Sequence, residues 1–156
     1  MISEDKKIVP VLVSANIGAS TDFDSIDMSN YHKATFICTC GAFTGAGTFQ
    51  FNTGVSEGAT TTNIPFKHAL GGAAVGTAVA ASTASCDVLG AWTDATTTAA
   101  ITCTTKMVVC EVDMAATATA GHNWLTGTIA ATAGIIHVVA ILEPRYSGNS
   151  SVTALK

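Results

Sequence analysis

The sequence is poor in charged residues, in aromatic residues and in clusters of positive charge. Charged residues make up 12% of the 156 residues, aromatic residues make up 6%, and the net charge is −4. A nucleic-acid-binding surface needs clustered Lys and Arg side chains that neutralise phosphates. Because the 7 Lys and Arg residues form no such cluster, we expect no direct contact with DNA or RNA.

Long hydrophobic runs are absent as well. A membrane-crossing helix needs about 17–25 apolar residues, and the most apolar stretch, residues 135–142, is far shorter. The first residues, MISEDKKIVPVLVS, have neither the basic nor the apolar segment of a secretory signal. The 5 cysteines are an odd number, which argues against a disulfide framework. We therefore expect reduced thiols, synthesis in a cytoplasm and no contact with a membrane.

Small uncharged residues, above all Thr, Ala, Gly and Ser, take the place of the missing charges. A surface built from Thr and Ala keeps a protein monomeric less well than a surface built from Lys and Glu. We therefore expect the protein to function packed against copies of itself or against a partner.

The stretch 134–146, GIIHVVAILEPRY, is typical of a central β-strand. Its branched apolar residues point to both sides of an extended backbone, so both faces are expected to be covered. Pro144 has no N–H for a strand ladder and is expected to end the strand. The pattern therefore predicts a strand in the middle of a sheet, with another strand on each side.

Other segments have the alternation or the composition of shorter strands. They are residues 8–14, 32–40, 48–52, 63–70, 99–105, 107–114 and 124–132. Pro10 and Pro65 favour sheet edges for two of these strands. The glycines of 41–47 indicate a turn that joins 32–40 and 48–52 in an antiparallel hairpin, and Gly127 indicates a bulge.

About seven or eight short strands without helical periodicity predict an all-β fold. We expect an antiparallel β-sandwich or jelly-roll-like single domain over residues 1–156. Flexible arms are expected at residues 1–10 and 147–156, and a long loop region of small residues at 69–98.

Cys38, Cys40, Cys103 and Cys110 could converge if their strands are neighbours. Four thiolates are a possible zinc ligand set. However, two sulfur atoms that are two residues apart on one strand face are about 7 Å apart, which is long for one tetrahedral ion. We expect buried free thiols and no metal, with the zinc site as the alternative.

No catalytic constellation is evident in the sequence. The 4 histidines are scattered, and no GxSxG or HExxH motif accompanies them. Glu111 and Asp113 lie on one strand face at a spacing that suits a glycosidase, but such a pair is more often a solvated face. An enzyme would need a cluster such as His137, Cys110 and Glu111. We expect no enzyme activity, no catalytic residue and no cofactor, and His137 as a hydrogen-bonded core or interface residue.

Two segments, SIDMSNYHKATFI (25–37) and IIHVVAILEPRY (135–146), resemble parts of small β-rich head decoration or cement proteins of tailed bacteriophages. The resemblance implies a structural virion protein that binds the outside of the phage head and stabilises the shell by bridging capsomers. It implies two partners, the major capsid protein and copies of this chain in a homo-oligomer, with a trimer as the expected form. The implied location is the capsid surface of the virion, after synthesis in the host cytoplasm.

Partner contacts are expected at the N-terminal arm, at the 69–98 region and at the C-terminal tail. The residues expected to make them are Ile8, Val9, Pro10, Trp92, Arg145 and Tyr146. Trp92 is included because an aromatic side chain in a loop is a frequent interface hot spot, and the resemblance implicates Arg145 and Tyr146. Two alternatives stay open: a phage tail or fibre component, and a carbohydrate-binding β-sandwich that uses Trp92 and Asp94.

Overall fold

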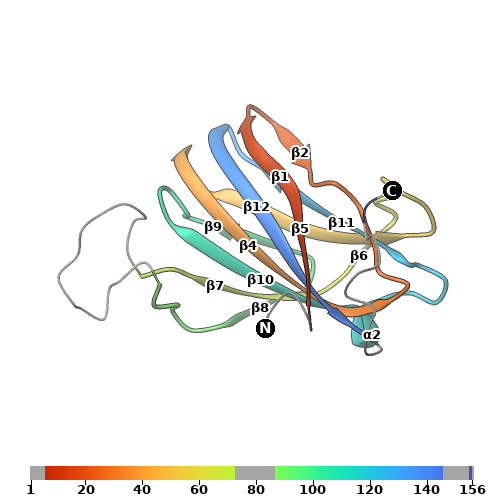
Figure 1. Cartoon of the computed structure of the whole chain (residues 1–156). Coiled ribbons are helices and arrows are strands. Elements are labelled where there is room, and N and C mark those ends of the chain that lie inside the picture. The colour runs from red at the N-terminus through yellow and green to blue at the C-terminus, as the bar shows by residue number, and fades with distance from the viewer. Residues whose placement is uncertain (1–5, 73–86, 146–154, 156) are drawn as a thin grey trace.

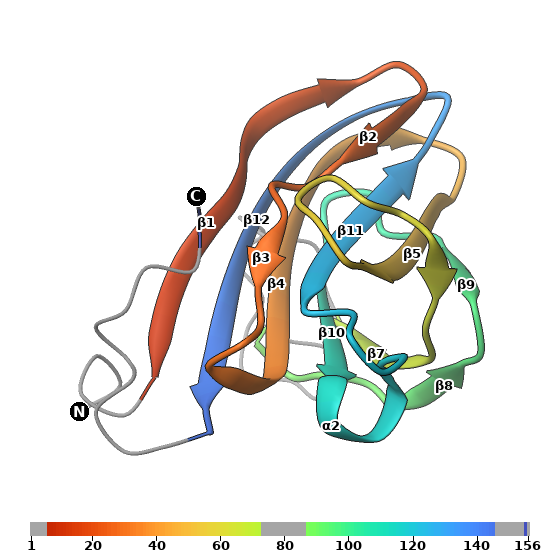
Figure 2. The same cartoon turned by 90° about the vertical axis from the view of Figure 1, so that its right-hand side faces the viewer.

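The protein folds into two antiparallel sheets that pack face to face (Figure 1 and Figure 2). The structure is a computed structural model and describes residues 6–72, 87–145 and 155. Its elements are β1 (Lys7–Ile17), β2 (Ser20–Asp22), β3 (Ile26–Asp27), β4 (Tyr31–Thr44), β5 (Gly47–Gly54), β6 (Thr62–Asn63), β7 (Phe66–Leu70), β8 (Thr93–Ala95), β9 (Thr98–Ile101), β10 (Met107–Asp113), α2 (Met114–Thr117), β11 (Trp124–Ala130) and β12 (Ala133–Pro144). The predicted all-β sandwich is therefore confirmed.

Each sheet has six strands. Sheet A has the order β1-β12-β4-β10-β7-β8, and sheet B has the order β2-β11-β5-β6, with β3 on β11 and β9 on β5. The core between the sheets contains a cluster of aromatic rings, in which the ring centroid of Phe51 lies 4.7 Å from that of Phe36 and 4.9 Å from that of Phe66. Burial of each such ring stabilises the fold by about 1.5–3 kcal/mol before conformational entropy is counted. No helix in the described ranges is long and apolar enough to cross a membrane.

β12 lies between β1 and β4, so the prediction of a strand on each side is confirmed. Its side chains alternate along the strand: Ile136 and Val138 are 0% exposed, whereas Ile135 is 50% exposed. The expectation that both faces are covered is therefore wrong at Ile135. The reason is that sheet B packs against only one face of sheet A.

β1 is an edge strand of sheet A and contains Pro10, as expected. Residues 7–10, however, belong to this strand and not to a flexible arm, because they pair in register with residues 139–142. Val9 and Val11 fill the core at 3% and 1% exposure, and this burial holds the strand on the sheet. The first five residues, and residues 146–154 of the predicted tail, lie outside the described residues.

The region 69–98, which was expected to be a long loop, contains strand residues. It includes the last two residues of β7, all of β8 and the first residue of β9. Gly71 also forms an isolated bridge with Leu89. Residues 73–86 lie outside the described part of the chain.

The expected hairpin of 32–40 with 48–52 is wrong. β4 pairs with β10 and β12 in sheet A, whereas β5 pairs with β6, β9 and β11 in sheet B. Gly45, between them, has a φ of 83°, a left-handed conformation that favours glycine. The turn therefore carries the chain from one sheet to the other. The prediction failed because an alternating pattern identifies the buried face of a strand but not the strand that pairs with it.

Two further expectations about strands are also wrong. The segment 63–70 is divided at Pro65 into β6 of sheet B and β7 of sheet A, and β7 is flanked by β10 and β8 and is not an edge. Gly127 makes no bulge, since β11 pairs with β5 in an unbroken register. The ring of Phe23 lies where a Cβ at Gly127 would stand, 2.3 Å from its Cδ2. Glycine is therefore needed there for packing.

Candidate functional site

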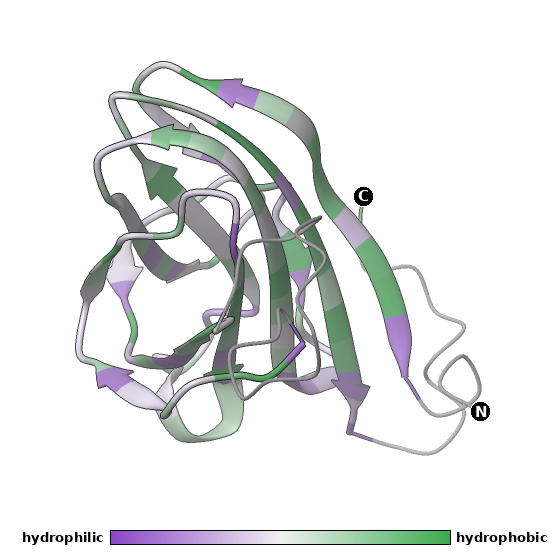
Figure 3. Ribbon diagram, turned by 90° about the vertical axis from the view of Figure 1, so that its left-hand side faces the viewer, coloured by the Kyte–Doolittle hydropathy of each residue, from purple (hydrophilic) through white to green (hydrophobic). Residues whose placement is uncertain are grey.

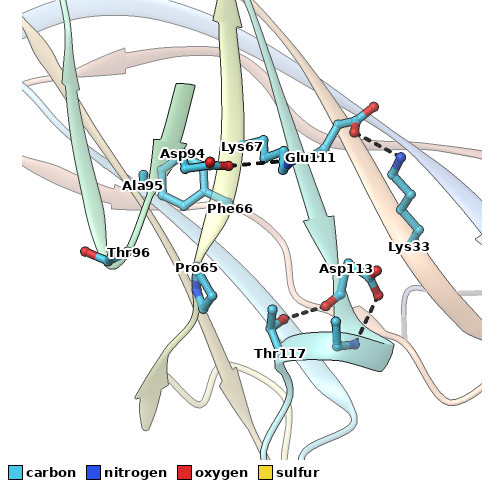
Figure 4. A pocket seen from close by; sticks show the side chains of 11 residues that line it. Lys33, Pro65, Phe66, Lys67, Asp94, Ala95, Thr96, Glu111, Asp113 and Thr117 are labelled. Atoms are coloured by element: carbon cyan, nitrogen blue, oxygen red, sulfur yellow. Dashed lines mark hydrogen bonds and ion pairs between the residues drawn. The ribbon is translucent and has the colours of Figure 1, made fainter. Parts of the chain in front are cut away.

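A groove of about 470 Å³ opens beside the end of β10 (Figure 4). It forms because β7 begins only after Pro65 and pairs with β10 as far as Glu111, while β10 continues to Asp113. The gap is lined by residues from β4, β7, β8, β10, α2 and the turns next to β7 and β8: Lys33, Pro65, Phe66, Lys67, Asp94, Ala95, Thr96, Glu111, Asp113, Ala116 and Thr117. Its walls thus combine apolar side chains with both signs of charge.

The charged groups of the groove already have structural partners. Lys33 Nζ lies 2.9 Å from Glu111 Oε2, and Lys67 Nζ lies 3.7 Å from Asp94 Oδ1. The hydrogen bond to Glu111 raises the pKa of Lys33 above its usual value. Figure 4 shows the pair of Asp94 with Lys67 next to the pair of Glu111 with Lys33.

Asp113 has a separate local role at the start of α2. Its Oδ1 accepts the backbone N–H groups of Ala115 and Ala116 at 3.0 and 3.2 Å, which caps the short helix. Glu111 therefore forms an ion pair with Lys33, and Asp113 caps α2. These contacts hold the rim of the groove in place.

The four described cysteines are buried free thiols, as the sequence predicts. They form two contacts in the core, Cys38 with Cys110 and Cys40 with Cys103. Hydrogen bonding to the neighbouring sulfur, together with burial, raises the pKa of Cys38 and of Cys40, so both stay protonated. The contact from Cys40 lowers the pKa of Cys103.

Potential metal ligands do not converge in the described ranges. No group of three or more His, Cys, Asp or Glu residues there could hold a metal ion. Cys110 faces the core, Glu111 faces outward, and His137 faces outward from β12, opposite Thr39 of β4. The cluster that an enzyme reading requires is therefore not assembled from these three residues.

Large exposed hydrophobic side chains gather at opposite edges of sheet A. Those in the described chain are Ile8 (50% exposed), Val13 (67%), Val55 (69%), Val88 (44%), Trp92 (45%) and Ile135 (50%). The side chains from β1 and β12 lie at one edge, and Val88 and Trp92 lie just before β8, the strand at the other edge. Val55 lies apart from both groups, directly after β5.

The residues expected to bind partners lie in different environments in the structure. Ile8, Pro10 and Trp92 are exposed, whereas Val9 is 3% exposed and belongs to the core. Arg145 fastens the end of β12 to the start of β4: its backbone N–H donates to Asn30 O, and its Nε donates to Tyr31 O, both at 2.9 Å. Tyr146 lies outside the described residues.

The outer face of sheet A carries a group of apolar side chains, interrupted by His137 and Thr39, whose exposure the sequence did not predict. We call it the outer band, and it consists of Ile8, Pro10, Val13, Ile37, Ile135, Val139 and Ile141, from β1, β12 and β4. All of these side chains are exposed or half-buried. In Figure 3, β12 is hydrophobic along most of its length. The signal for the band was present, since residues 135–142 do not alternate with polar residues.

Neither a protein-family model nor a curated protein matches the sequence. Among solved structures, the chain is similar to the SPBc2 prophage-derived protein YomS, with a TM-score of 0.45 and 12% sequence identity. The match covers 88% of this chain and 92% of that chain. A similarity of this size gives no information on function.

Proposed function

We propose that this chain is a structural protein of a phage particle, a decoration protein that binds the outside of the head and stabilises the shell. Its partners are the major capsid protein and further copies of itself. It works by adding contacts between shell subunits, and its sites are surfaces for other proteins.

The observation that carries this proposal is the placement of exposed hydrophobic side chains at both edges of one sheet. Ile8 and Val13 lie on β1, and Val88 and Trp92 lie beside β8, with four strands between these edges. A protein that bridges neighbouring subunits needs two separate contact surfaces on a rigid body, because several weak contacts then act together. The packed core of the sandwich holds the two edges at a fixed distance.

The edge beside β8 is the better candidate for the shell contact. Trp92 is exposed, and tryptophan is among the residues that most often dominate an interface. Val88, four residues earlier, is a second exposed apolar group on the same segment. We expect these two side chains to fill an apolar pocket of the shell protein.

The resemblance to phage head decoration proteins supplies the biological setting of the proposal. The first segment contains β3 and the first half of β4, and the second contains most of β12. Within them, β4 and β12 pair from Tyr31 with Pro144 to Ile37 with Val139. β4 and β12 are neighbours inside sheet A, so the resemblance concerns strands that form the framework of the fold.

The first test is the copy number of this chain relative to the major shell protein in purified particles, measured by quantitative mass spectrometry. A ratio of one to one, or a simple fraction of it, supports a protein that covers the shell lattice. A handful of copies per particle overturns the decoration role in favour of a tail or fibre component. Absence from particles removes the virion role altogether.

The second test compares Trp92→Ala with Val55→Ala in binding to particles that lack this chain. Both side chains are exposed, so neither change should affect folding. We expect Trp92→Ala to lose binding and Val55→Ala to keep it. Equal binding of both variants overturns the assignment of Trp92 to the shell contact. Binding to a glycan array that Trp92→Ala abolishes, with no binding to particles, would favour the carbohydrate-binding alternative.

A further inference from the structure

The two thiol pairs in the core differ in the geometry that holds them. Cys38 lies on β4 opposite Val108 of β10. Cys110 lies on β10 opposite Phe36, so Cys38 and Cys110 are diagonal neighbours on adjacent strands. The Cα atoms of such neighbours are about 7–8 Å apart, whereas a disulfide spans about 4.4–6.8 Å. Both strands are paired on each side within sheet A, which keeps this pair too far apart for a disulfide.

The second pair joins a strand to a turn. The N–H of Lys106 donates to Cys103 O at 2.9 Å, which closes a four-residue turn. The N–H of Cys40 donates to Lys106 O at 3.0 Å, so the turn is docked on β4. Across this junction the thiols of Cys40 and Cys103 are in hydrogen-bonding contact. A turn outside the sheets adjusts its backbone more readily than a strand paired on both sides, so this pair can reach disulfide geometry.

Cys103 is the more reactive thiol of the second pair. Its sulfur accepts hydrogen bonds from the Cys40 thiol and from the backbone N–H of Gly47, and these bonds lower the pKa of Cys103. A Cβ placed at Gly47 would lie 3.4 Å from the same sulfur, so the backbone approaches it closely. The hydrogen bond to Cys103 and burial raise the pKa of Cys40. The pair therefore combines a thiol that ionises more readily with a neighbouring thiol that can react with its oxidised form.

The second pair is buried but lies close to the surface. Cys103 is 0% exposed and Cys40 is 2% exposed. The two residues that follow Cys103 in the turn, Thr104 and Thr105, are exposed. Burial excludes a bulky thiol reagent, whereas hydrogen peroxide is close to water in size and needs only a small opening of the turn.

We propose that Cys40 and Cys103 are a redox pair, which a peroxide converts into a disulfide that fastens β4 of sheet A to the turn after β9 of sheet B. First, the Cys103 thiolate attacks a peroxide oxygen, the O–O bond breaks, and a sulfenic acid and hydroxide form. Then the Cys40 sulfur attacks the Cys103 sulfur, the S–O bond breaks, and water leaves with the Cys40 proton. Overall the two thiols lose two electrons and two protons, and one hydrogen peroxide is reduced to two water molecules.

The disulfide strengthens the link between the two sheets. Cys40 and Cys103 are 63 residues apart in the sequence, and a bridge that closes a loop of this length strongly restricts the unfolded chain. Under the proposed function, the chain is made in a reducing cytoplasm and then leaves the cell on a particle, so the bridge forms after release. The chemistry of the pair does not depend on that function, and it is tested on the isolated chain.

The test treats the full chain with hydrogen peroxide in a Cys86→Ser background, which removes the fifth cysteine. Peptide mapping without reduction then identifies the linked residues. We expect a loss of about 2 Da per chain and one cross-link, between Cys40 and Cys103, with Cys38 and Cys110 unlinked. The midpoint of urea unfolding should rise by about 1–2 M and return to its initial value after reduction with dithiothreitol.

Two variants of that chain separate the roles of the two sulfurs. Cys40→Ala removes the second thiol, so peptide mapping after peroxide treatment should find oxygen added at Cys103. Cys103→Ala should leave Cys40 unoxidised, because burial keeps this thiol protonated. Circular dichroism checks that both variants are folded, and the cross-link of the parent chain is measured without either of them.

A folded chain whose four thiols stay reduced in peroxide, and are oxidised only in urea, overturns the proposal. So does a cross-link between Cys38 and Cys110, or a cross-link between Cys40 and Cys103 that leaves the urea midpoint unchanged. Equal oxidation of Cys40 in the Cys103→Ala variant and of Cys103 in the Cys40→Ala variant overturns the assignment of Cys103 as the thiol that reacts first.

Discussion

Replacement of Gly127 by alanine is expected to destabilise the fold, because aromatic rings already occupy the position of the new methyl group. An added Cβ would lie 2.3 Å from Cδ2 of Phe23 and 2.9 Å from Cε1 of Phe51. Phe23 is 3% exposed and Phe51 is 0% exposed. Neither ring can move aside without displacing its neighbours in the core.

The expected magnitude follows from two opposing effects. Forcing an extra methyl group into a packed core costs about 1–3 kcal/mol. Alanine in a strand recovers about 0.5–1 kcal/mol relative to glycine, because it loses less backbone entropy on folding. We therefore expect Gly127→Ala to lower the free energy of unfolding by about 1–2 kcal/mol.

The assay is urea unfolding followed by tryptophan fluorescence, in which the midpoint should fall without a change in slope. Gly18→Ala is the control, since an added Cβ there has nothing within 4 Å, and it should change stability by less than about 0.5 kcal/mol. Phe23→Leu should relieve the clash, so the double variant should lose less than the sum of the two single losses. A Gly127→Ala variant as stable as the wild type would refute the packing argument.

Three further predictions concern charge, capping and thiols. Lys6 lowers the pKa of Glu143 below its usual 4.5, so this pair stabilises the fold at neutral pH and ceases to do so as the pH falls through the lowered pKa. Glu143→Gln should therefore flatten the acid limb of a stability–pH curve, whereas Glu57→Gln should not. Asp113→Ala removes the cap of α2 and should cost about 0.5–2 kcal/mol in urea unfolding; a cost no greater than that of Glu57→Ala would contradict the capping role. In a Cys86→Ser background, the four buried thiols should not react with a thiol reagent until urea unfolds the chain, and rapid labelling in buffer would contradict their burial.

The sequence predicts buried faces well because alternation is a local property. The pattern of 32–40 places Phe36, Cys38 and Cys40 on one face, and all three are buried in β4. Strand pairing is not local in the same way. β4 and β5 are adjacent in the chain but lie in different sheets, and the turn at Gly45 is compatible with a hairpin and with a crossover alike.

The candidate surfaces were predictable only in part, for the same reason. The edge position of Pro10 and the exposure of Trp92 follow from the absence of an N–H and from loop composition. The groove depends on β7 beginning beside Glu111 of β10. Glu111 is opposite Lys67, 44 residues earlier in the chain, and neither segment alone indicates this register. Arg145 is expected from the resemblance to contact a partner, and its contacts within the chain, to the carbonyls of Asn30 and Tyr31, were not predicted.

The pairing of β1 with β12 joins the first described strand to the last, and this has a consequence for synthesis. Sheet A cannot acquire its β1 edge until residues 133–144 have left the ribosome, which takes roughly 5–25 s at about 5–20 residues per second. During that time the apolar residues of β1 have no partner strand, and such segments tend to associate between chains. The solubility of the growing chain therefore depends on Lys6, Lys7 and Pro10, which interrupt the apolar segment where it begins.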